Sequence, residues 1–124
     1  MSITFYAALE AEHAEYGTII KMVDALDRFS VNASNSNAFR LLDRLGIENP
    51  DYCGSMAAGD FLGRCMVANV GRPDHGIEPV EFSSEGGATM IDCGLRAGYF
   101  EERIEQLADL ATAAAALGCL VAWA

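Results

Sequence analysis

The chain has 124 residues, of which 52% are apolar and 21% are charged. This length fits one small domain with a single core, and the apolar content excludes an intrinsically disordered protein. The 18 acidic and 8 basic residues give a formal charge of −10. Because nucleic-acid binders present basic surfaces, this charge argues against direct nucleic-acid binding. We expect one domain that spans residues 1–124.

The first residues and the cysteines predict a cytoplasmic protein. No basic region opens the sequence, so we expect no export signal. The longest uncharged stretch, residues 110–124, is shorter than the roughly 20 residues that cross a bilayer, so we expect no membrane association. The cysteines lack the close pairs of a zinc ribbon, and we expect reduced thiols and no bound metal. They are Cys53, Cys65, Cys93 and Cys119.

The first half of the sequence predicts one strand and two helices. Residues 3–9 are apolar and β-prone, which predicts a strand. Residues 18–29 place apolar side chains at helical spacing, which predicts a helix. Residues 38–46 form a second predicted helix, with N-cap candidates in the polar run 32–37 and a stop at Gly46.

The segment after the second helix predicts a loop, a third helix and a hairpin. The loop contains Asn49-Pro50 and Cys53-Gly54, and the helix covers about residues 57–70. A second loop follows at residues 71–76. Two β-prone segments, residues 79–83 and 88–93, flank a Gly-Gly pair, which is typical of a β-hairpin.

The strongest helical pattern covers residues 98–117 and has two glutamates in its first turn, where the helix dipole favours negative charge. Residues 119–123 predict a closing strand. The sequence thus predicts an α+β domain of three to four helices on a small sheet. The alanine-rich stretch 111–116 allows close helix approach, either inside the fold or to a second copy in a homo-oligomer.

No catalytic signature stands out. The sequence has no P-loop, dinucleotide-binding, zinc-protease or nucleophile-elbow motif. His13 and His75 are the only histidines, and neither has a second ligand at metal spacing. We therefore expect a protein that is not an enzyme and has no cofactor.

Two polar clusters remain as candidates for ligand binding. The first is the Asn- and Ser-rich run 32–37 with Arg40, and the second is residues 92–99 with Arg103. Asn both donates and accepts hydrogen bonds, Arg presents a fork suited to phosphate, and helix starts attract anions. Tyr99 offers a ring on which a base can stack. The candidate residues are Asn35, Asn37, Arg40, Arg96, Tyr99 and Arg103.

A purely structural interpretation of the same residues stays open. The Asn and Ser side chains can cap the helix, Arg96 can pair with Asp92 or Glu102, and Tyr99 can pack in the core. Seven of the eight basic residues are Arg, which a GC-rich coding sequence also explains.

Four segments carry a resemblance: residues 35–42 (NSNAFRLL), 60–64 (DFLGR), 91–99 (IDCGLRAGY) and 121–124 (VAWA). They resemble a group of small proteins encoded by bacteriophages and prophages of GC-rich bacteria, over about residues 32–124. The resemblance implies an accessory protein that acts in the host cytoplasm. It brings no assigned activity and no residue roles.

Two functions follow as expectations. The first is a non-catalytic sponge that binds and sequesters a small phosphate-bearing, nucleotide-like host immune signal through the two polar clusters. The alternative is an acidic inhibitor of a host nuclease or DNA-binding defence complex, of the anti-CRISPR or anti-restriction type, whose negative charge mimics the nucleic-acid backbone. The polar clusters favour the first, because they are a local signal and net charge is not.

Overall fold

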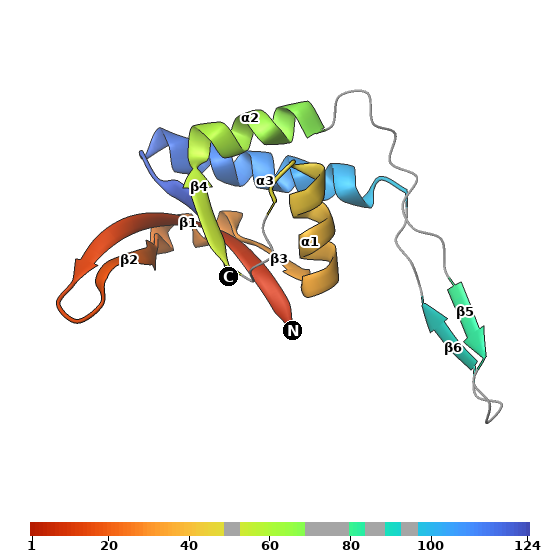
Figure 1. The fold of residues 1–124 in the computed structure, drawn as a ribbon. Coiled ribbons are helices and arrows are strands. Elements are labelled where there is room, and N and C mark those ends of the chain that lie inside the picture. Colours follow the sequence, from red (N-terminus) through yellow and green to blue (C-terminus); the bar gives the residue numbers. More distant parts are fainter. Residues whose placement is uncertain (49–52, 69–79, 84–88, 93–96) are drawn as a thin grey trace.

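A computed structural model describes residues 1–48, 53–68, 80–83, 89–92 and 97–124. It shows the predicted α+β architecture, with the α-helices on one face of a five-stranded antiparallel sheet (Figure 1). The elements are β1 (Ser2–His13), β2 (Gly17–Met22), η1 (Asp24–Phe29, a 3₁₀-helix), β3 (Val31–Ser34), α1 (Asn35–Arg44), β4 (Gly54–Ala57), α2 (Ala58–Ala68), β5 (Val80–Ser83), β6 (Thr89–Asp92), α3 (Tyr99–Ala116) and β7 (Leu120–Trp123).

The long strand β1 organises the sheet, whose order is β2-β1-β7-β4. Its first residues pair with β3, with Ser2 opposite Ser34, and its last residues pair with β2, with His13 opposite Gly17. Its middle pairs with β7, so that Phe5 lies opposite Trp123. One strand therefore connects three others that come from both ends of the sequence.

The core lies between the sheet and the helices. Alternate residues of β1 (Ile3, Phe5 and Ala7) are buried, as expected for one face of a strand with period two. The rings of Phe5, Phe61 and Trp123 pack with centroids 6.2–6.4 Å apart and join β1, α2 and β7. α2 lies along α3 above them (Figure 1).

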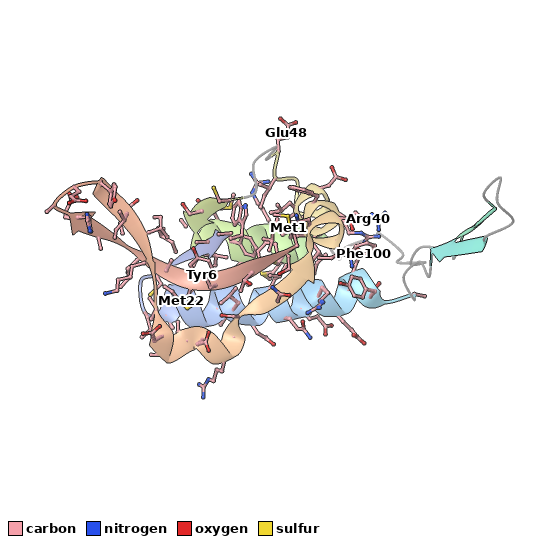
Figure 2. All side chains as sticks on the ribbon, turned by 90° about the horizontal axis from the view of Figure 1, so that it is seen from below. Met1, Tyr6, Met22, Arg40, Glu48 and Phe100 are labelled. Atoms are coloured by element: carbon pink, nitrogen blue, oxygen red, sulfur yellow. The ribbon has the colours of Figure 1, made fainter. Side chains whose placement is uncertain are left out.

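The other face of the sheet is more polar. Asn32 Nδ2 donates to Thr4 Oγ1 at 2.8 Å and to Ser2 Oγ at 3.1 Å across the β1–β3 pair. Figure 2 views the molecule from this side, with the sheet in front of α2 and α3. Asn32 thus acts within the sheet and does not face the start of α1.

The predicted helix over residues 18–29 is wrong. Residues Gly17–Met22 form strand β2, and only residues Asp24–Phe29 are helical, in a 3₁₀-helix. Thr18, Ile19 and Ile20 are β-branched and suit a strand, and Gly17 adopts a φ of +72° at the turn that folds this strand back on β1. Pairing with β1 outweighed the helical spacing.

The other predicted elements are confirmed with shifted ends. The predicted first strand, the helices over residues 38–46, 57–70 and 98–117, and the closing strand correspond to β1, α1, α2, α3 and β7. The predicted hairpin corresponds to the antiparallel pair β5–β6. The predicted loop at residues 71–76 and the hairpin's Gly-Gly turn lie outside the described residues. Two short strands were missed: β3 inside the polar run 32–37, and β4 where a loop was predicted.

Candidate functional site

The starts of α1 and α3 meet in space. Asn37 Nδ2, in the first turn of α1, donates to the hydroxyl of Tyr99, the first residue of α3, at 3.3 Å. Arg40 Nη1 donates to Asn37 Oδ1 at 3.5 Å, and the Arg103 guanidinium lies 5.6 Å from the centre of the Tyr99 ring. Figure 2 shows Arg40 on the same side as Phe100, the residue after Tyr99. Four of the six candidate residues therefore form one continuous cluster, which we call the α1–α3 cluster.

The local sequence explains how α1 presents Asn37. Ser34 is the N-cap, and its hydroxyl accepts a hydrogen bond from the Asn37 backbone N–H at 3.4 Å. Asn35 donates its backbone N–H to the carbonyl of Met1, which ties the helix start to β1. The Asn35 Oδ1 atom is buried and has no hydrogen-bond partner within the described part of the chain.

The start of α3 is less suited to binding an anion than we expect of a helix start from the sequence alone. The N-cap residue is Gly98, which has a φ of +83° and no side chain that could accept a hydrogen bond from the helix start. Glu101 and Glu102 occupy the first turn, where they complement the helix dipole and repel an incoming anion. Any phosphate recognition here falls to the arginine side chains rather than to the helix start.

The remaining candidates are placed as follows. Arg96 lies outside the described residues, so its predicted role stays a prediction. Asn35 is close to the α1–α3 cluster in sequence, but its backbone N–H donates to the carbonyl of Met1, the residue before β1.

A hollow of about 390 Å³ lies on the other side of Arg103, between the end of η1 and the middle of α3. Its lining includes Arg28, Ser30, Arg103, Gln106 and Asp109. Of these residues, only Arg103 is predicted from the sequence to bind a ligand. The sequence predicts a single helix over residues 18–29 and does not predict the 3₁₀-helix η1 that carries Arg28. No pattern in the sequence predicts that Arg28 lies near α3.

A larger hollow of about 860 Å³ lies between the end of α1 and α2. Arg64 Nη1, on its wall, donates to the carbonyls of Leu45 and Gly46 at 3.1 and 2.9 Å. This guanidinium satisfies carbonyls at the end of α1, a structural role.

The alanine-rich stretch of α3 packs inside the fold. Ala111 and Ala114 are fully buried in the core between the helices and the sheet. Internal packing therefore accounts for these two small residues without a second copy. Thr112, Ala115 and Ala116 are exposed.

Among the described residues, the cysteines and His13 form no reactive cluster. Cys65 and Cys119 are buried free thiols, and Cys53 is exposed. His13 Nδ1 accepts hydrogen bonds from the backbone N–H groups of Glu15 and Tyr16, which fixes the turn between β1 and β2. Within the described ranges no group of three or more His, Cys, Asp or Glu side chains is placed to hold a metal ion. None of the described helices is long and apolar enough to cross a membrane.

The comparisons with known proteins add no relative. No protein-family model matches the chain, and neither the curated proteins nor the solved structures give a match.

Proposed function

We propose that the protein binds and sequesters a small phosphate-bearing, nucleotide-like ligand at the α1–α3 cluster and does not alter it chemically. The observation that carries this proposal is the 3.3 Å hydrogen bond between Asn37 Nδ2 and the Tyr99 hydroxyl, which brings two polar clusters together. In line with the resemblance to phage and prophage proteins, the ligand would be an immune signal of the host cell.

The chemistry of the cluster supports this ligand class. The Tyr99 ring is half-buried, so one part is anchored and another is open to a stacking base. Arg40 is exposed and Arg103 half-buried, and both can reach a phosphate as charge-assisted donors. The Asn37 amide can exchange its bond to Tyr99 for one to a ribose hydroxyl or a base edge.

Thermal unfolding with a panel of cyclic dinucleotides, cyclic trinucleotides and cyclic ADP-ribose isomers tests the proposal. A true ligand at a hundredfold excess over its Kd should stabilise the fold by about 2.7 kcal/mol. The ligand should be recovered unaltered by chromatography, since a sponge does not turn it over. A converted ligand would make the protein an enzyme, and no shift across the panel would contradict the proposal.

Variants at Tyr99 test the site itself. Tyr99→Leu should weaken ligand binding by about tenfold or more, because base stacking contributes roughly 1–3 kcal/mol. Tyr16→Leu is the matched control, since Tyr16 is 74% exposed on the β1–β2 turn, outside the cluster. Calorimetric titration of both variants gives the two Kd values. Equal losses would show that the effect does not come from the cluster.

One observation keeps the acidic-inhibitor alternative as a second candidate. The β1–β2 hairpin extends beyond the layers of the fold (Figure 1) and carries exposed Glu10, Glu12 and Glu15. If this hairpin docks on a host nuclease, Glu10→Gln with Glu12→Gln should relieve inhibition of DNA cleavage by the purified nuclease. The same double variant should leave nucleotide binding unchanged.

A further inference from the structure

We infer that the hollow between η1 and α3 is an anion site that takes the phosphate group of a mononucleotide-sized ligand. Arg28 and Arg103 supply the charge, and Ser30 supplies a hydroxyl donor. The identity of the ligand beyond its phosphate rests on the proposed function, whereas the phosphate site stands on its own residues. We call it the Arg28–Arg103 hollow.

Two arginines from different elements line this hollow. Arg28 comes from the last turn of η1 and Arg103 from the second turn of α3, and both line the hollow. Within the described part of the chain neither guanidinium has an ion-pair partner, although the protein has 18 acidic residues. The lining holds these two positive charges and one carboxylate, Asp109, so the hollow keeps a net positive charge that a bound anion would offset.

Both guanidiniums are held in place. Arg28 lies over the Phe29 ring at 4.8 Å, and Arg103 lies over the Tyr99 ring at 5.6 Å. Arg103 Nη1 also donates to Gln106 Oε1 at 3.0 Å. A preorganised arginine loses less conformational entropy when it binds, which favours affinity for a small anion.

The hydroxyl of Ser30 provides a second, independent observation in favour of a ligand in this hollow. Its Oγ atom is buried and has no hydrogen-bond partner among the described residues, and Ser30 lines the same hollow. A buried hydroxyl without a partner is costly, so such groups are normally satisfied. A phosphate oxygen would accept a hydrogen bond from this hydroxyl.

The remaining wall of the hollow limits the ligand. Gln106 and Asp109 add acceptors next to the arginines, and the Asp109 carboxylate disfavours a second anionic group. A ligand with a single phosphate and neighbouring hydroxyl groups would bind the arginines through its phosphate and donate hydrogen bonds to Gln106 and Asp109 through its hydroxyls. The volume of about 390 Å³ lies at the lower end of small-molecule sites. It fits a phosphorylated sugar or mononucleotide better than a cyclic trinucleotide.

Titration with inorganic phosphate, followed by amide NMR shifts at constant ionic strength, tests the site. Saturable shifts should appear at Ser30 and Gln106. Arg28→Gln should weaken phosphate binding by about tenfold, since one charge-assisted hydrogen bond is lost. Ser30→Ala should weaken it severalfold. Lys21→Gln is the control, because it removes one positive charge from an exposed side chain on β2, outside both the hollow and the α1–α3 cluster, and should change nothing.

The outcomes separate this inference from the proposed function. No saturable phosphate binding, or an equal loss in Lys21→Gln, would overturn the site. Nucleotide binding that depends on Tyr99 but not on Arg28 or Ser30 would overturn it too, and would leave the proposed function standing. Phosphate binding that depends on Arg28 and Ser30, with no nucleotide ligand in the panel, would support the site and contradict the proposed function. AMP should bind more tightly than phosphate, and adenosine more weakly than AMP.

Discussion

Cys65 lies on the buried face of α2 and is 2% exposed. Burial raises the pKa of its thiol from an ordinary 9.0 to about 12, because the low-polarity core disfavours the charged thiolate. The thiol therefore stays protonated at any physiological pH and acts as a small apolar side chain. Cys53, by contrast, is exposed.

This burial predicts a loss of stability at high pH. Above pH 9 the unfolded chain loses the Cys65 proton while the folded chain keeps it up to about pH 12, so stability falls as pH rises through this window. The loss due to Cys65 should approach about 1.4 kcal/mol per pH unit. Urea unfolding of the wild type and of Cys65→Ala between pH 9 and 12 measures it, and the variant should show the shallower slope. Parallel slopes would contradict the prediction.

At the scale of single residues, the polar run 32–37 shows how much of the candidate site could be predicted from the sequence. Five uncharged polar residues near one another predict a capped helix start, and Ser34 caps it. Which of the asparagines is available for a ligand depends on strand β3, which turns Asn32 toward the sheet and leaves Asn37 against Tyr99. That division follows from pairing with β1, a contact that no local pattern encodes.

At the scale of elements, α2 carries two glycines that the described fold does not require. A Cβ added at Gly59 or Gly63 would meet nothing within 4 Å. Glycine lowers helix stability because the unfolded chain has more freedom to lose. Gly46 is the opposite case, because it follows α1 with a φ of +70° and a Cβ there would lie 3.2 Å from Arg64 Nη1.

These glycines predict stability changes of opposite sign. Gly63→Ala should raise the free energy of unfolding by about 0.5–1 kcal/mol, and Gly59→Ala should do the same. Gly46→Ala should lower it by about 1–2 kcal/mol, because alanine is strained at this φ and crowds the arginine that caps α1. Differential scanning calorimetry gives the three midpoints. A lower Tm for Gly63→Ala would indicate that this face of α2 is covered.

Helices and strands differ in how well the sequence predicts them here. α1, α2 and α3 each have local signals, such as caps, an apolar stripe and a glycine stop, and all three were predicted. The short strands β3 and β4 have few side chains with a periodic pattern and exist because β1 and β7 offer edges to pair with. The same tertiary pairing changed the expected helix over residues 18–29 into β2 and η1, which brings Arg28 against α3.

At the scale of the whole molecule, one aromatic cluster joins the sheet to the helices. Trp123 of β7 is 3% exposed and packs against Phe5 and Phe61. It is the only tryptophan of the chain, so its fluorescence reports on the contact between β1, α2 and β7. The three rings make the sheet and the helix layer depend on each other.

This dependence predicts cooperative unfolding. Tryptophan fluorescence and far-ultraviolet circular dichroism should give the same urea midpoint, because the core and the helices lose their packing together. Trp123→Phe should keep the single transition, whereas Phe61→Ala should cost about 3–5 kcal/mol through the cavity that it leaves. Separate midpoints for the two probes would show that the layers unfold independently.

The pairing of β1 with β7 also has a consequence during synthesis. Phe5 pairs with Trp123, which lies far later in the sequence and is therefore synthesised well after it. Until then β1 has its β2 and β3 partners on one edge, while its other edge and its aromatic contacts lie open. Such an edge invites pairing with other chains. The nascent protein should therefore depend on chaperone protection until Trp123 has been made, and should complete its sheet only after that.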